Sequence, residues 1–157
     1  MDDALVRGLR YMTAQLAVLS AAVHAAVAAP RLSAAFTSGS VPRLATLLFV
    51  LAVAGILAGI VAVRFRLAPR RTVYALGLLL MLGQVLGWVA YHNLALLGGH
   101  THGSYSILSN TWAHFVGDPV EAAAKTAETL AALLLVVLLR VDTDPVLSAD
   151  SRAPWSA

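Results

Sequence analysis

Histidine is the residue type whose placement most suggests chemistry in this sequence, because imidazole nitrogen binds haem iron and transition metals. His24 and His92 lie within long apolar segments, each six residues before a residue expected to end its segment, Pro30 and Gly98. At a helical rise of about 1.5 Å per residue, both imidazoles are expected about 9 Å below the outer ends of two membrane helices. Two imidazoles at one depth can hold haem b, so we predict a cofactor site at His24 and His92. The alternative role for each imidazole is hydrogen bonding between helices.

A lysine and two glutamates interrupt another apolar segment, where charged groups are costly unless they are paired or functional. Asp118 and Pro119 are typical of a helix start, and Glu121 fits a capping box in which its side chain reaches back to the N-cap. Lys125 and Glu128 follow about 9 and 13 Å deeper at helical rise. Their i,i+3 spacing predicts an intramembrane charge pair, and Lys125 is also suited to neutralise a haem propionate. The functional alternative for the pair is a proton or ion site.

Three further histidines fall in the connection expected at about residues 99–118. His100 and His102 form an HxH pair flanked by glycines, and His114 follows twelve residues later. Three imidazoles can form an open site for Zn²⁺, Cu²⁺ or Ni²⁺, and we predict a metal site at these residues. The alternative is a polar loop whose histidines hold no ion. The sequence has no cysteine, which excludes thiolate zinc sites, iron–sulfur clusters and disulfides.

Polar and small residues recur at helical spacing beside both histidines of the predicted cofactor site. The two stripes are Thr13, Ala17, Ser20 and His24, and Gln84, Trp88 and His92. Because polar groups in a membrane face the protein interior, we expect these two stripes to meet across the core.

The composition excludes a water-soluble globule. The 157 residues are 59% hydrophobic and 12% charged, against about 25% charged in soluble domains, and the mean hydropathy is +0.79. The net charge of +3 comes from few basic residues at the ends of apolar segments, where they act as topology signals, so no nucleic-acid partner is expected.

Four segments are long enough to span a bilayer as helices, which need about 20 apolar residues each. They cover about residues 9–29, 44–63, 72–98 and 119–141, and Pro30 is expected to stop the first. The sequence therefore predicts an all-α, integral membrane four-helix up-down bundle in one domain, residues 1–141. Residues 142–157 are polar and contain two prolines, which predicts a disordered cytoplasmic tail.

The arginines predict the orientation of this multi-pass protein in the cell membrane. Residues 64–71 contain four arginines, and basic connections stay in the cytoplasm. This assignment places both termini in the cytoplasm and the histidines near the extracytoplasmic face. Arg7 and Arg10 before the first apolar segment also allow a cleaved signal peptide, but that segment is longer than is usual for one.

Pairs of glycines predict where helices approach closely. Gly55/Gly59 and Gly83/Gly87 each form a GxxxG step. Both steps suit packing within the bundle, and either one also suits a homo-oligomer or a membrane-protein partner.

The function predicted from these residues is haem or transition-metal binding near the extracytoplasmic face, in a redox or accessory respiratory-type component. One alternative is a non-catalytic accessory subunit of a larger membrane complex, and a weaker one is a proton or ion transporter. The sequence has no P-loop, HExxH or nucleophile-elbow motif, which argues against a kinase or a hydrolase. Enzymatic activity is therefore not indicated.

Overall fold

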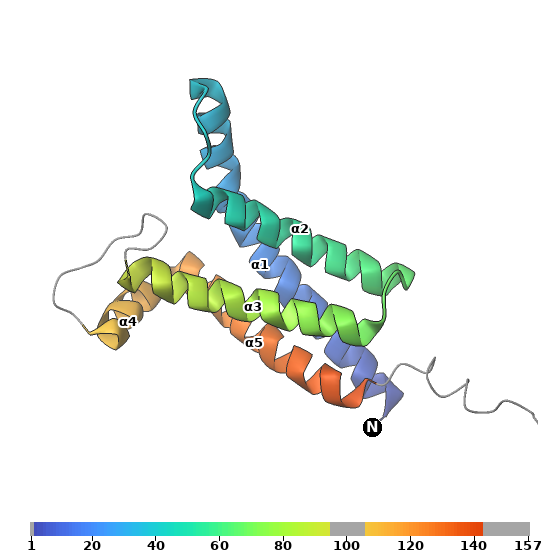
Figure 1. The fold of residues 1–157 in the computed structure, drawn as a ribbon. Coiled ribbons are helices and arrows are strands. Elements are labelled where there is room, and N and C mark those ends of the chain that lie inside the picture. The colour runs from blue at the N-terminus through green and yellow to red at the C-terminus, as the bar shows by residue number, and fades with distance from the viewer. Residues whose placement is uncertain (1, 95–105, 143–157) are drawn as a thin grey trace, which may run out of the picture.

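The computed structural model describes residues 2–94 and 106–142, which form five α-helices and no β-strand (Figure 1). The helices are α1 (Asp3–Ser38), α2 (Leu44–Phe65), α3 (Arg70–Asn93), α4 (Ile107–Gly117) and α5 (Pro119–Val141). All except α4 are long and apolar enough to cross a membrane. The predicted all-helical class and the four membrane-length helices are therefore confirmed for the described part of the chain.

Helix α1 continues to Ser38, so the prediction that Pro30 stops the first helix is wrong. Proline removes one backbone N–H, and a helix whose other turns are well bonded tolerates this loss. The helix ends instead at Gly39, whose φ of 65° lies in the left-handed region that glycine adopts without strain. The Ser40 N–H donates to the Ala35 carbonyl at 2.9 Å and completes this C-cap. In Figure 1 the last turns of α1 project beyond the start of α2.

The second and third apolar segments form α2 and α3, whose ends differ from the prediction by at most five residues. Helix α2 runs two residues further than expected, and α3 begins two residues earlier. Helix α3 ends at Asn93, where the Leu94 N–H closes it on the Ala90 carbonyl at 2.9 Å, and its predicted end at Gly98 lies outside the described residues.

A short helix, α4, occupies part of the segment that the sequence predicted as a loop. Ser106 is its N-cap and accepts a hydrogen bond from the Ser109 N–H at 3.2 Å. Asn110, one turn into α4, donates to the backbone carbonyl of His92 at 2.6 Å. This bond satisfies an acceptor at the end of α3 and fixes α4 against it.

Helix α5 begins at Pro119 as predicted, with Asp118 as its N-cap. The Asp118 carboxylate accepts from the N–H groups of Val120 at 2.8 Å and of Glu121 at 3.1 Å. The predicted capping box is wrong, because the Glu121 carboxylate accepts the indole N–H of Trp88 on α3 at 3.0 Å. The Asp118 N–H is bonded to the carbonyl of His114 instead.

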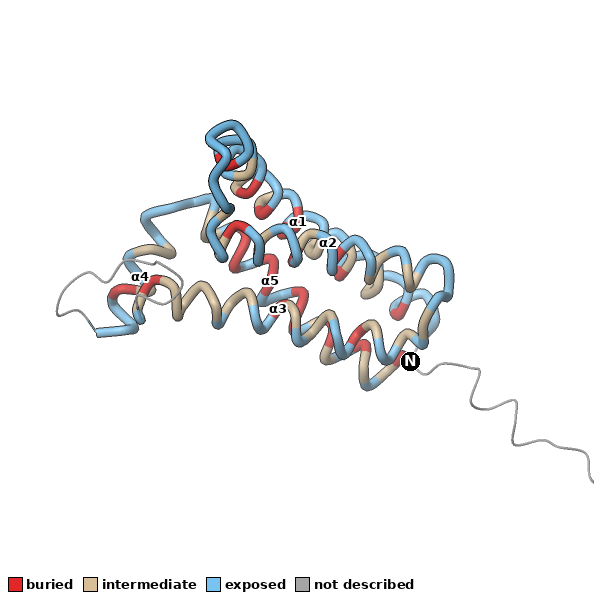
Figure 2. Tube along the Cα trace, turned by 45° about the horizontal axis from the view of Figure 1, so that its top comes forward, coloured by how far each residue is buried: buried red, intermediate tan, exposed pale blue. Residues whose placement is uncertain are grey.

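The four long helices pack in a cycle, in which α5 contacts α1 and α3, and α2 contacts the same two helices. Figure 2 shows buried positions on the facing sides of the helices, whereas much of α2 is exposed. Helix α5 contributes more buried residues than any other described helix, including four alanines: Ala124, Ala127, Ala131 and Ala132. Small residues of this kind allow the backbones of neighbouring helices to approach closely.

The two GxxxG steps have different surroundings. A Cβ placed on Gly55 would lie 3.2 Å from Leu80, and one on Gly59 would lie 3.6 Å from Val73, so this step packs against α3 within the chain. A Cβ on Gly83 or Gly87 would meet nothing within 4 Å. The second step therefore leaves open space beside α3.

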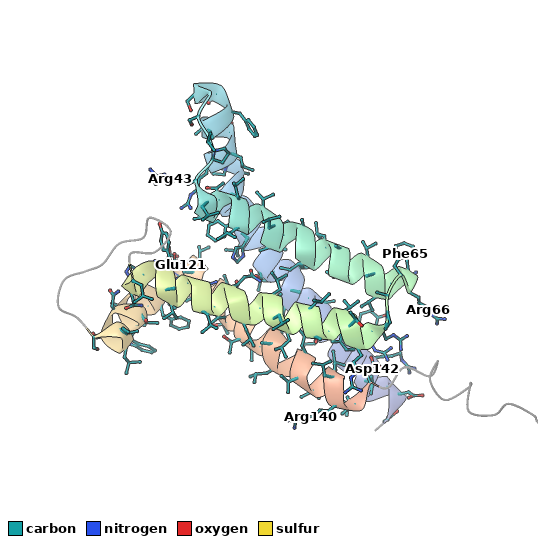
Figure 3. All side chains as sticks on the ribbon, in the orientation of Figure 1. Arg43, Phe65, Arg66, Glu121, Arg140 and Asp142 are labelled. Carbon is teal, nitrogen blue, oxygen red and sulfur yellow. The ribbon has the colours of Figure 1, made fainter. Side chains whose placement is uncertain are left out.

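At the end of α5, Asp142 holds three helices together, so the predicted tail does not begin at this residue. Arg10 of α1 forms a bidentate pair with its carboxylate, and the Tyr74 hydroxyl of α3 donates to it at 2.6 Å. Arg70 lies 3.6 Å away. The Asp142 side chain is 3% exposed, and Figure 3 places it at the end of the helices opposite Glu121. Residues 143–157, the rest of the predicted tail, lie outside the described residues.

The Asp142 cluster predicts a specific loss of stability in acid. Burial alone would raise the pKa of Asp142, but the bonds from Arg10 and Tyr74 outweigh burial and hold this pKa below its usual 3.8. Because this pKa is lowered, the cluster stabilises the fold fully above about pH 4–5. The stabilisation is lost as the pH falls further and the Asp142 carboxylate becomes protonated. Thermal unfolding in detergent from pH 7 to pH 3 measures the effect. The gap in stability between the wild type and Asp142→Asn should narrow progressively below pH 4, and a constant gap down to pH 3 would contradict the prediction.

Candidate metal centre and neighbouring polar cluster

Three possible metal ligands from three helices converge at the end of the fold opposite Asp142. One ligand atom from each of His92 (α3), His114 (α4) and Glu121 (α5) lies within 4.8 Å of the other two. The Nε2 atom of His92 is 3.9 Å from Glu121 Oε2, and the two imidazole ring centres are 4.1 Å apart. Two atoms that each lie about 2.1 Å from one zinc ion are about 3.4 Å apart across a tetrahedral angle. A small movement would therefore bring all three ligands onto one ion.

Hydrogen bonds around this group orient its ligands. His92 Nδ1 lies 3.0 Å from the Trp88 carbonyl oxygen, which can only accept, so Nδ1 carries the proton. In its neutral form, this ring therefore has its lone pair on Nε2, the atom that lies toward Glu121. Trp88 also donates its indole N–H to Glu121, so one residue positions both ligands. Metal-binding histidines are commonly held by a bond of this kind to a backbone carbonyl.

The predicted metal site included His114 but combined it with different partners. His100 and His102 lie outside the described residues, so the structure does not place them. The sequence predicted haem binding for His92 and a capping role for Glu121, so the group that these two residues form with His114 was not predicted. The N-cap residue Ser106 is the sequence signal that could have predicted this group, because a helix that starts there brings His114 close to the start of α5.

His24 belongs to a second polar cluster, deeper between α1, α3 and α5. Lys125 Nζ donates to Glu128 Oε2 at 2.6 Å, which confirms the predicted contact between these two residues. The Ser20 hydroxyl donates to Glu128 Oε1 at 3.0 Å, and His24 Nε2 lies 3.7 Å from the same oxygen. Ser20 Oγ also lies 3.4 Å from Gln84 Oε1, so the two polar stripes meet as expected.

The burial of this second cluster is nearly complete. Glu128 and Ser20 have no exposed surface, and His24 is 5% exposed. Such a carboxylate is tolerated because Lys125 and Ser20 both bond to it. The cluster therefore needs no ligand to satisfy Glu128.

The two histidines of the predicted haem site border one cavity but face different carboxylates. His24 is turned to Glu128 and His92 to Glu121, both on α5. The depth predicted for His24 is wrong, because α1 ends not at Pro30 but at Ser38, about 21 Å beyond His24 at helical rise. Both histidines and Lys125 line a cavity of about 510 Å³.

The two clusters thus offer different chemistry. The His92–His114–Glu121 group has two imidazoles and one carboxylate with no lysine or arginine bonded to that carboxylate among the described residues. In the deeper cluster the ammonium of Lys125 occupies the place beside Glu128 that a cation would take. Compared with known proteins, the chain matches no protein-family model, no curated protein and no solved structure.

Proposed function

We propose that this protein is a four-span membrane protein that binds a divalent transition metal at His92, His114 and Glu121. The four long helices support the membrane location, and the arginines of residues 64–71 support an up-down bundle with both termini in the cytoplasm. In this orientation the metal lies near the extracytoplasmic face.

The single observation that carries the proposal is the convergence of the three ligand atoms within 4.8 Å. Two histidines and one glutamate are the protein ligands of many catalytic zinc sites, and two histidines and a carboxylate also hold non-haem Fe²⁺. Both kinds of site keep positions open for water or a small molecule. The ligand set therefore suits an open Zn²⁺ or Fe²⁺ site better than a closed structural metal site. Bound Fe²⁺ would make the protein a redox component.

Metal analysis of the detergent-purified protein tests this function. The wild type is expected to hold about one transition-metal ion per chain, and His114→Ala should lower its metal affinity by about tenfold to a hundredfold. His24→Ala is the matched control, because His24 lies outside the ligand group, and it should keep the metal.

Three results would contradict this assignment. Metal-free wild type would exclude a tightly bound ion, and equal metal content in wild type and His114→Ala would place the ion elsewhere. A Soret band lost on His24→Ala would assign His24 and His92 to haem b instead.

A further inference from the structure

The cavity that borders both clusters has mostly apolar walls and a polar inner end. Its apolar walls come from all four long helices, and those of α1, α2 and α3 include Val23, Val27, Leu48, Phe49, Leu79 and Leu80. His24, Gln84 and Lys125 lie together at the inner end, since all three contact or adjoin the Glu128 cluster. Cavities of about 300–1,000 Å³ with few polar groups are typical of small-molecule sites.

Lys125 has one hydrogen-bond donor to spare. An ammonium has three N–H groups. Glu128 accepts one at 2.6 Å, and the backbone carbonyl of Gln84 accepts another at 3.5 Å. No third acceptor bonds to Lys125 among residues 2–94 and 106–142. Because this residue lines the cavity, a ligand with an accepting oxygen would complete its hydrogen bonding.

The charges around the cavity favour a neutral ligand. Arg31 and Lys125 are the cationic lining residues, and Asp118 and Glu121 are the anionic ones. Glu128 lies directly behind Lys125 and neutralises it. An anionic molecule would therefore find no net positive charge at Lys125 to oppose its own, a cationic group would face the ammonium of Lys125, and a neutral acceptor has no charge to desolvate.

The wall formed by α3 suits a flat ring. Gly83 and Gly87, one turn apart, both line the cavity, and a Cβ on either would meet nothing within 4 Å. Trp88 and Tyr91 lie beside them, and Phe49 lies on α2. Aromatic side chains next to open space are well suited to stack on a planar ring.

From these four features we propose that the cavity binds a quinone-class head group, a flat neutral ring with carbonyl oxygens. One carbonyl accepts the spare N–H of Lys125, the ring lies along Gly83 and Gly87, and the alkyl chain lies along the apolar walls. This site goes beyond the proposed metal centre, with which it shares His92 and Glu121 as lining residues, whereas His114 does not line the cavity and can be changed without altering its walls. The proposal concerns binding and assigns no electron transfer.

Binding of decylubiquinone to the full chain in nanodiscs tests the proposal. The amount bound is measured against empty nanodiscs, so that partition into lipid is subtracted. The wild type should bind saturably, with one quinone per chain. Gly87→Leu fills the open space and should weaken binding by about tenfold or more, whereas Gly8→Leu, also a helical glycine in open space but outside the cavity, should leave it unchanged.

Two further measurements distinguish recognition of the quinone carbonyl from non-specific binding of an apolar molecule in the cavity. The double variant Lys125→Met/Glu128→Gln removes the donor without leaving an unpaired charge and should weaken quinone binding by about tenfold. Decylbenzene, which has the chain and ring but no carbonyl, should not bind saturably. Circular dichroism checks that each variant is folded, and the double variant tests the site independently of Gly87→Leu.

The proposal is overturned if Gly87→Leu binds quinone as tightly as the wild type, or if decylbenzene binds as tightly as the quinone. The second result would assign the cavity to lipid acyl chains. His114→Ala keeps this test distinct from the metal test, because it should lose the metal and retain the quinone.

Discussion

Lys125→Met is expected to lower the free energy of unfolding by about 3–5 kcal/mol, because it leaves the Glu128 carboxylate buried without a cation. Lys125 Nζ is 2.6 Å from Glu128 Oε2, and Glu128 has no exposed surface through which water could replace the ammonium. Within the part of the chain that the structure describes, His24 at 3.7 Å is the other ion-pair partner of Glu128, and it is too distant for a hydrogen bond. Unfolding by SDS titration in mixed micelles measures the loss.

The double variant Lys125→Met/Glu128→Gln is the decisive comparison. It removes both charges and keeps an acceptor for the Ser20 hydroxyl, so it should regain most of the stability that Lys125→Met loses. Arg140→Met makes the same type of substitution at an exposed position of α5 and should change stability by less than about 0.5 kcal/mol. Equal losses in the single and double variants would show that the charge pair is not what stabilises this part of the core.

The second large effect is expected from removing both arginines around Asp142. Arg10 binds the Asp142 carboxylate directly, and Arg70 stands 3.6 Å from it. Arg70→Met alone should cost about 1 kcal/mol or less, because Arg10 remains. Among the described residues, Arg10→Met/Arg70→Met leaves only the Tyr74 hydroxyl bonded to a buried carboxylate. It should cost about 3–5 kcal/mol, more than the sum of the single losses.

Two exposed neighbours provide the matched control for this variant. Arg7 lies on α1 near Arg10, and Arg71 adjoins Arg70, so Arg7→Met/Arg71→Met removes the same number of positive charges from the same end of the protein. Its unfolding free energy should stay within about 1 kcal/mol of the wild type. Additive single losses in the Arg10 and Arg70 pair would contradict the shared role of the two arginines.

The sequence by itself determined the features that depend on neighbouring residues along the chain. Apolar length located four helices, since each must bond its own backbone over about 20 residues. The Asp118–Pro119 step located the start of α5, because an N-cap bonds N–H groups only two and three residues ahead. The pairing of Lys125 with Glu128 followed from helical spacing in the same way.

Only the tertiary structure decided what depends on contacts between helices. Local pattern assigned Glu121 to a capping box, yet Trp88, 33 residues earlier, takes its carboxylate and turns it toward His92. The local sequence predicted Asp142 as the start of a polar tail, but in the fold its carboxylate binds Arg10, which is 132 residues away. The neighbouring sequence of a carboxylate is the same whether the group caps a helix, forms an ion pair or binds a metal ion. Its partner is chosen when packing brings one donor close and removes the water that would otherwise compete.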